Sequence, residues 1–311
     1  MSEDLWRSLL TWYAEQKRDL PWRHTRDPYA ILVAETMLQQ TGVDRVIPKY
    51  EAFLHSLPTL ESLASAPPSL VIRLWSGLGY NRRAVRLQQA ARRAVERWGH
   101  LLGDVNDLLS LPGIGPYTAR AVACFAFDAQ VPVCDTNVQR VLTRLFVGPE
   151  NGVPRLSQQR TLALAESVLP PGRAYEWNQA LMDLGATICT AYTPLCLLCP
   201  VGLLCCSFPL IKERGNARDR AVADERPRWK TQPFHDSRRY YRGRIVEALR
   251  RVASGGRLSL AELGTLVKNG YTEADRAWLL ALVQKLEREE LAAVKAGNGE
   301  DMTQVTVSLA E

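Results

Sequence analysis

The sequence predicts a mainly α-helical protein that ends in a small α/β module. Through the first two hundred residues, apolar side chains recur at helical spacing, and no convincing strand interrupts them. Within this region the glycine hairpin of residues 111–115 (LPGIG) precedes an almost unbroken run of small and apolar residues. After residue 238, capping boxes and two short β-type runs follow a helical pattern. These observations separate a large helical part from a different C-terminal part.

Amphipathic helices account for most of the large part. The first is predicted over residues 1–23, where Leu5 and Leu9 share one apolar face. A second helix follows Pro28 and covers residues 29–40. Further helices are predicted over residues 46–57, 60–66, 69–76, 82–98, 118–127, 158–169 and 175–188, with another that begins at Asp135.

A carboxyl group on the second helix is predicted to be buried. Ile31, Leu32 and Leu38 lie about one turn from Glu35, which places its side chain on the apolar face. Burial of a carboxyl group is unfavourable unless the group is paired or protonated, and burial raises the pKa of such groups in general. Two interpretations stay open: Glu35 bonds a buried backbone group or arginine, or it acts as a proton donor.

The glycine hairpin and a nearby aspartate predict a second chemical feature. Gly113 and Gly115 free the backbone from Cβ clashes, and N–H groups at a helix start can hold a phosphate. The buried helix of residues 118–127 and a short apolar run lead to Asp135, which opens the next helix. Asp135 is therefore either a helix N-cap or a carboxylate that works beside a bound phosphate.

Four of the seven cysteines fall within seventeen residues, in the pattern C-x6-C-x2-C-x5-C. A structural zinc site usually joins two close pairs of ligands by a longer loop, whereas this loop has one close pair with wider gaps on both sides. Four thiolates in one compact loop suit a [4Fe–4S] cluster. The predicted ligands are Cys189, Cys196, Cys199 and Cys205.

Composition narrows the class of protein. A hydrophobic fraction of 46% and a charged fraction of 23% are ordinary for globular domains. The most apolar late stretch, residues 195–206, is much shorter than the ~20 residues of a membrane helix, and the N-terminus lacks the apolar segment of a signal peptide. We therefore expect a cytoplasmic protein without membrane association, nucleoid-associated if it binds DNA, whose cysteines hold metal rather than form disulfides.

The C-terminal part begins with a change of charge. Residues 212–244 contain eleven Lys or Arg against five Asp or Glu, so this segment alone carries an excess equal to the +6 of the whole chain. This concentration favours a nucleic-acid partner, and most of the segment is predicted to be an exposed linker. A helix is predicted over 240–252, two more follow capping boxes at Ser259 and Thr272, and strands are predicted over 291–295 and 303–309 with a turn at Asn298-Gly299. Such a winged-helix-like module either binds DNA or only packs on the chain.

The motifs together resemble a known superfamily. LPGIGPYTA, the aspartate of VCDTNVQRVL and the four-cysteine loop are similar to those of the helix-hairpin-helix DNA glycosylases of the endonuclease III superfamily. Within it, LPWR, AETMLQQT, LWSGLGY and NQALMDLGATIC resemble the MutY-type adenine DNA glycosylases, over about residues 1–206. The resemblance implies a glycosylase domain over 1–211, with a six-helix barrel (24–134) and a cluster subdomain (1–23 and 135–211) that hold DNA between them. The linker would cover 212–237 and the module 238–311.

The resemblance also implies a role for each site residue. Glu35 would protonate the leaving adenine, and Asp135 would stabilise the positive charge that develops on the sugar, as paired carboxyl groups do in sugar hydrolysis. Tyr117 stands where lyase members carry a catalytic lysine; a phenol forms no Schiff base, which implies a monofunctional hydrolase acting on a flipped-out base. The implied base pocket is Leu20, Trp22, Arg23 and Gln179. The implied DNA contacts are Gln39, Gln40, Tyr80, Gly113, Gly115 and Thr118, of which Gln40 and Tyr80 would fill the gap and wedge the opposite strand.

The expected activity is removal of adenine opposite 8-oxoguanine or guanine, by a monomer that binds double-stranded DNA containing a mismatch. Alternatives are a glycosylase for thymine or uracil opposite guanine, which AETMLQQT disfavours, and a non-catalytic DNA-binding protein, which the presence of both Glu35 and Asp135 disfavours. The sequence departs from the family pattern at Asn81, where a second tyrosine is usual, at Gln139, often basic, and in TAYTPL, which lacks basic residues. The C-terminal part does not resemble the family's 8-oxoguanine-reading domain, which leaves the opposite-base preference open.

Overall fold

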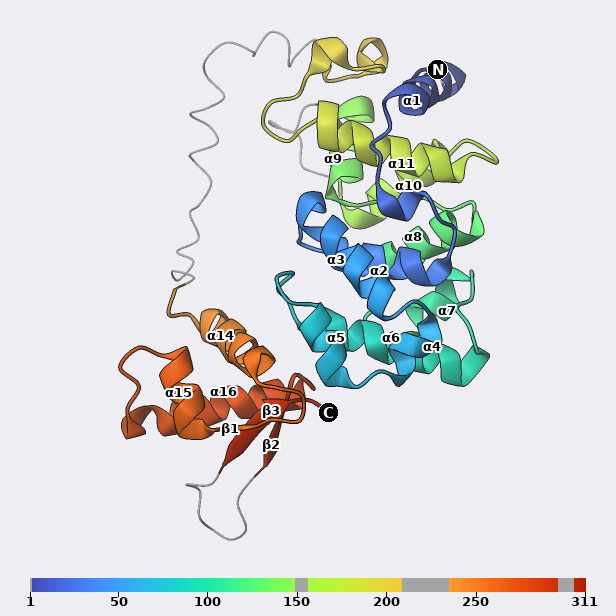
Figure 1. Ribbon diagram of the computed structural model, residues 1–311. Helices are drawn as coiled ribbons and strands as arrows, with labels where there is room; N and C mark the ends of the chain where they lie inside the picture. Colours follow the sequence, from blue (N-terminus) through green and yellow to red (C-terminus); the bar gives the residue numbers. More distant parts are fainter. Residues whose placement is uncertain (1, 149–155, 209–234, 296–304) are drawn as a thin grey trace. The chain divides into compact units, whose positions relative to one another are not determined.

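The computed structural model describes residues 2–148, 156–208, 235–295 and 305–311. The described chain is mainly helical, as predicted, and its one small sheet belongs to the C-terminal part (Figure 1). It divides into two compact units. One draws on residues 1–32, 102–110 and 114–228, and the other on residues 33–101, 111–113 and 229–311. The domain boundaries predicted above remain a prediction.

The first unit is built around a bundle of helices. Its elements are α1 (Ser2–Gln16), a 3₁₀ turn (Pro21–Arg23), α7 (Val105–Leu109), α8 (Pro116–Phe127), α9 (Thr136–Phe146), α10 (Gln158–Ser167), α11 (Ala174–Asp183), a π-helical turn (Leu184–Ile188) and 3₁₀ turns at Cys196–Leu198 and Gly202–Leu204. Helix α1 packs along α11, and α9 packs against α10 and α11. Leu9, Leu142 and Trp177 lie fully buried in the core that these helices share.

The first helix ends earlier than predicted. The sequence pattern extends it to residue 23, but α1 ends at Gln16. Leu20 is extended, with φ −132° and ψ 132°, because a residue that precedes proline is disfavoured in the α region. The buried helix after the hairpin is confirmed as α8, which begins at Pro116, a favoured residue for the first helical position.

The second unit contains the remaining helices and the sheet. Its elements are the end of α2 (Pro28–Leu38), α3 (Val43–Ser56), α4 (Leu60–Ser65), α5 (Pro68–Leu74), α6 (Arg82–Trp98), α14 (Arg238–Arg251), α15 (Leu260–Val267), a 3₁₀ turn (Glu273–Asp275), α16 (Arg276–Arg288), and strands β1 (Leu258–Ser259), β2 (Ala292–Lys295) and β3 (Thr306–Leu309). Helices α4 and α5 pack on α6, and α14 packs on α15 and α16.

The C-terminal module has the predicted elements and one more. The strand order is β1-β3-β2, all antiparallel, with Val307 opposite both Leu258 and Val294. The capping boxes at Ser259 and Thr272 are confirmed, although the second opens a 3₁₀ turn before α16. Strand β1 was not predicted, since two residues carry no alternating pattern and β1 is defined by its pairing with β3. The module core continues onto Ile72 and Val85 of the helical part.

Two of the predicted features fall on residues that the structure does not describe. The predicted turn at Asn298-Gly299 and residues 212–234 of the predicted linker lie outside the described residues. Among the helices that are described, none is long and apolar enough to cross a membrane.

Candidate active site

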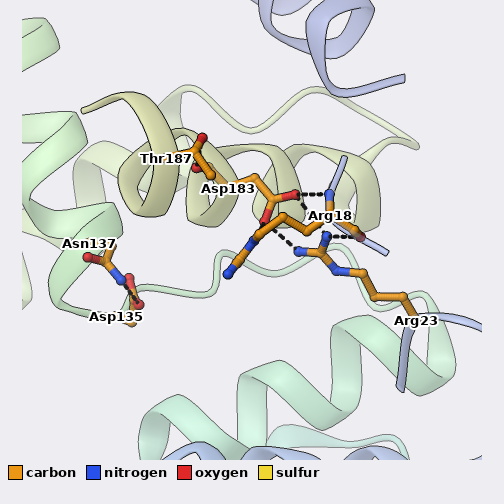
Figure 2. A network of polar contacts seen from close by, with 6 residues as sticks. All are labelled: Arg18, Arg23, Asp135, Asn137, Asp183 and Thr187. Carbon is orange, nitrogen blue, oxygen red and sulfur yellow. Dashed lines mark hydrogen bonds and ion pairs between the residues drawn. The ribbon is translucent and has the colours of Figure 1, made fainter. Parts of the chain in front are cut away.

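Asp135 caps the N-terminus of α9. Its Oδ1 accepts a hydrogen bond from the Val138 backbone N–H at 2.7 Å, which confirms the N-cap interpretation. Its Oδ2 accepts from the Asn137 side-chain amide at 3.0 Å (Figure 2). The carboxylate therefore has a fixed orientation at the positive end of a helix, an electrostatic environment that favours negative charge. A cap and a chemical role are compatible here, because the residue is only half-buried.

A chain of polar contacts joins Asp135 to the cysteine loop. The Arg140 guanidinium donates to Asn137 Oδ1 at 2.8 Å, and also to the backbone carbonyls of Gly185 at 2.7 Å and Cys189 at 2.9 Å. One helical turn further, Arg144 donates to the carbonyls of residues 190 and 191 and lies 3.5 Å from the Cys189 sulfur. Helix α9 thus carries the capping aspartate at its start and holds the cysteine loop with two buried arginines.

The four predicted cysteine ligands line one small cavity together with Arg144. All four are free thiols. Four thiols that line a common cavity, with an arginine beside one sulfur, are a donor set that can ligate iron. Burial raises the pKa of the Cys199 thiol to about 12.

The residues of the implied base pocket are buried close to an ionic network. Leu20, Trp22 and Gln179 are buried, and Arg23 forms a two-pronged pair with Asp183, both bonds being 2.8 Å long. Arg18 adds a third charged bond to the same carboxylate, at 2.7 Å, as Figure 2 shows. Burial alone would raise the pKa of Asp183, but its bonds to Arg23 outweigh that effect and hold the pKa below its ordinary value. The network ties the segment after α1 to the end of α11.

Glu35 is buried on α2, as its sequence neighbours predict. The residue is 5% exposed, and Ile31 and Leu32, one turn earlier in α2, are also buried. The role of Glu35 as a proton donor stays a prediction.

Two of the implied DNA contacts have unusual backbone conformations. Gln40 and Tyr80 are not glycines, yet both have positive φ, at 58° and 46°. Such conformations cost about 1–3 kcal/mol each and persist only where the surroundings enforce them. Tyr80 is also one of the large exposed hydrophobic side chains, with 54% exposure. We call the segments 39–41 and 77–81 the Gln40 loop and the Tyr80 loop.

Arg83 enforces both loops. Its guanidinium donates to the carbonyls of Thr36 and Met37 at the end of α2, to Thr41 Oγ1 at 3.1 Å, and to the carbonyls of residues 78 and 79 at 3.2 Å. The guanidinium also lies 5.6 Å from the centre of the Tyr80 ring. Burial lowers the pKa of Arg83 to about 10. One half-buried arginine therefore fixes the two loops to each other. Gln39 is half-buried, and its carbonyl accepts from the same arginine.

The glycine hairpin needs its first glycine for two reasons. Gly113 has φ +78°, and a Cβ there would lie 2.6 Å from the Arg86 Cβ. Gly115 is the N-cap residue of α8, Tyr117 is half-buried in the first turn, and Thr118 is buried. The phosphate-binding role of the hairpin stays a prediction.

Several residues of the site could not be predicted from the sequence, because their hydrogen-bond partners are distant in the chain. Asn178 is fully buried and bonds the backbone of Val131 and Val133, which fixes the segment leading to Asp135. Arg83 and Arg140 reach carbonyls more than forty residues away. A polar residue on an otherwise apolar helix face was the available signal for Asn178 and Arg140.

The chain matches one family model and several known proteins. Residues 33–169 match the family described as HhH-GPD superfamily base excision DNA repair protein. The chain is 47% identical over 196 residues to the adenine DNA glycosylase of Mycolicibacterium smegmatis, covering 62% of this chain and 66% of that one. It is 45% identical to the adenine DNA glycosylase of Homo sapiens over 64% of this chain and 38% of the human one. The chain thus spans less than two thirds of these relatives.

A longer match extends through most of the chain. The adenine DNA glycosylase of Mycobacterium tuberculosis (strain CDC 1551 / Oshkosh) is 40% identical over 275 residues, 87% of this chain and 86% of that one. Among solved structures, a thermostable thymine-DNA glycosylase aligns with a TM-score of 0.63 and 32% identity, over 67% of this chain and 97% of that one. A trapped endonuclease III–DNA intermediate shares the fold, with a TM-score of 0.59 and 20% identity over 68% of this chain and 99% of that one. The chain belongs to the adenine DNA glycosylase family of the HhH-GPD base-excision-repair superfamily.

Proposed function

We propose that the chain is a monofunctional DNA glycosylase that hydrolyses the N-glycosidic bond of adenine mispaired with 8-oxoguanine or guanine. The observation that carries the proposal is the Asp135 carboxylate, oriented by Val138 N–H and the Asn137 amide at the start of α9. A carboxylate held in this way can stabilise positive charge on a deoxyribose without reorganising. The long match to relatives named adenine DNA glycosylase supports adenine as the base.

In this reaction Glu35 donates a proton to the leaving adenine, so that the C1′–N9 bond breaks with its electron pair on the base. Water then adds to C1′ and gives up a proton, which leaves an abasic site. Asp135 lowers the energy of the cationic sugar between these events. Tyr117 offers no amine for a Schiff base, so the strand stays intact after base loss. The substrate is mismatched double-stranded DNA, with the adenine flipped out of the helix and held by residues including Leu20, Trp22 and Gln179. The enzyme acts as a monomer on chromosomal DNA within the cell.

The test is strand cleavage of duplexes that carry A:8-oxoguanine, A:G, T:G or U:G, each with and without alkali. We expect cleavage of the two adenine duplexes after alkali alone, and no covalent trapping by borohydride. Release of thymine or uracil without release of adenine would overturn the proposal. That second activity is worth including in the panel because a thymine-DNA glycosylase is among the structural neighbours.

We also propose that Cys189, Cys196, Cys199 and Cys205 hold a [4Fe–4S] cluster. When bound, the cluster would replace thiol protons by iron–sulfur bonds and brace the loop that Arg140 and Arg144 contact. Protein purified without chelators should contain about four iron atoms per chain and absorb light at about 400 nm. One zinc per chain, with no iron, would contradict this assignment.

A further inference from the structure

The second unit contains a groove that the proposed reaction does not use. Its volume is about 670 Å³, and its walls come from the Gln40 loop, the Tyr80 loop, the start of α6, and helices α14 and α16. We call it the arginine groove. It is lined chiefly by Gln40, Tyr80, Arg82, Arg86, Arg239 and Arg242, of which the last two belong to the C-terminal module.

The charge of this groove is strongly positive. Arg83 is a fifth lining arginine, and no carboxylate is among the described residues that line the groove. Glu289, which is not part of the lining, pairs with Arg242 and lies 3.8 Å from Arg82. Because five arginines and no carboxylate are among the described lining residues, the lining itself favours a polyanion.

The C-terminal module is fastened to the helical part at this groove. Arg250 of α14 donates to the Ile72 carbonyl at 2.9 Å and to Asn81 Oδ1 at 3.0 Å. In return, Arg73 of α5 donates to the backbone carbonyls of Arg250 and Val252. The shared core with Ile72 and Val85 lies beside these bonds. Asn81, a departure from the usual family tyrosine, is thus the point where the Tyr80 loop meets the module.

We propose that the arginine groove binds backbone phosphates of duplex DNA next to the mismatch, with Arg239 of the module as a principal contact. Guanidinium groups bind phosphate through charge-assisted hydrogen bonds, and each neutralised phosphate releases counterions. DNA is the polyanion that fits, because the groove is continuous with Gln40 and Tyr80. This inference rests on the proposed function only in assuming that these two residues face DNA. It gives the C-terminal module a direct part in binding the substrate.

The experiment compares full-length variants that change the same charge on the same helix. Arg239→Glu places a carboxylate in the groove, whereas Arg251→Glu changes a side chain that is 80% exposed and outside the groove lining. Binding of a fluorescent A:8-oxoguanine duplex and of a matched duplex is measured by anisotropy at several salt concentrations. Thermal melting of each variant verifies the fold.

We expect Arg239→Glu to weaken binding of both duplexes about 10-fold and to reduce the salt-dependence slope by about one. Arg251→Glu should stay within about 2-fold of the parent protein, as exposed charges distant from the DNA do. Equal effects of the two variants, or no effect of Arg239→Glu in a folded protein, would overturn the assignment of the groove. Failure of the proposed function has a different signature, since the parent protein would then bind duplexes but release no adenine.

Discussion

At the scale of single residues, Asp135 has two partners that differ in what they require. The Val138 N–H needs only an oxygen, whereas the Asn137 amide donates to the second carboxylate oxygen. Asparagine caps helices about as well as aspartate, so Asp135→Asn should keep α9 in place. The substitution removes the negative charge and places the new side-chain amide next to the amide of Asn137, so that two hydrogen-bond donors can face each other.

We therefore expect Asp135→Asn to release base roughly 100- to 1000-fold more slowly in single-turnover assays, the usual cost of losing an oriented electrostatic group. Its Kd for duplex DNA should change little, because the role that we propose for this charge is to stabilise the reacting sugar rather than to bind DNA. A variant with near-parental turnover would remove Asp135 from the catalytic machinery.

Asp183 is a buried carboxylate that pairs with two arginines. Asp183→Asn leaves Arg23 buried without its charged partner, and Arg18, which is partly exposed, with less to bind. Loss of one partner of a buried pair costs about 3–5 kcal/mol in unfolding free energy, toward the lower end here because water screens Arg18. Urea denaturation at neutral pH measures the loss. Asp4→Asn, which breaks an exposed pair with Arg7, is the control and should have a far smaller effect.

The pH dependence of that stability follows from the lowered pKa of Asp183. A carboxyl group with a folded-state pKa below its ordinary 3.8 stabilises the protein fully above that value and loses its contribution as the pH falls through the folded pKa. The parent protein and Asp183→Asn should therefore differ most above about pH 4 and converge in stronger acid. Parallel stability curves down to low pH would show that the pair contributes nothing through ionisation.

At the scale of elements, most helices could be predicted because their signals are local. The Asp135 cap, the two capping boxes and the burial of Glu35 each depend on residues within four positions. Other features depend on groups that periodicity does not encode. The end of α1 depends on a proline, the length of β1 on its pairing with β3, and the hydrogen bonds of Arg83 on distant carbonyls. Sequence therefore predicted which side chains are chemically notable but not which distant groups hold them.

The π-helical turn after α11 requires a glycine at position 185, because the turn packs closely against α9. A Cβ on Gly185 would lie 2.8 Å from the Asn137 Cβ, at the partner of Asp135, and the Gly185 carbonyl also accepts from Arg140. Gly185→Ala must therefore shift the π turn and the start of α9 relative to each other. We expect a lower Tm, by several degrees, together with slower base release at unchanged DNA affinity.

The control for this prediction is Gly243→Ala in α14, where an added Cβ meets nothing within 4 Å. Alanine in a helix interior should leave Tm unchanged or raise it slightly, since glycine costs about 0.5–1 kcal/mol there. If Gly185→Ala behaved like this control, close packing of the π turn against α9 would not be what positions Asp135.

At the scale of the whole molecule, the docked C-terminal module could not be predicted from its composition. The sequence indicated a winged-helix-like module and left open whether it binds DNA or only packs. Its attachment depends on Arg73 and Arg250, each of which reaches carbonyls about 180 residues away in the chain, beyond any local pattern. The module does pack on the helices of the second unit, and our proposal for the arginine groove adds DNA binding to that packing.

Arg250→Met tests whether docking creates the groove. Methionine keeps the apolar stem of a side chain that is only 9% exposed, but removes the bonds to Ile72 and Asn81. The bonds from Arg73 to the carbonyls of α14 and Val252 then remain without the bonds that Arg250 made in the opposite direction. We therefore expect α14 to move relative to the Tyr80 loop. We expect faster hydrogen exchange in α14 and weaker DNA binding with the reduced salt slope of Arg239→Glu, while the Tyr80 loop retains its Arg83 bonds. Combining Arg250→Met with Arg239→Glu should then add little, because both remove the same phosphate contact. Fully additive losses would mean that Arg239 meets DNA without the docked geometry.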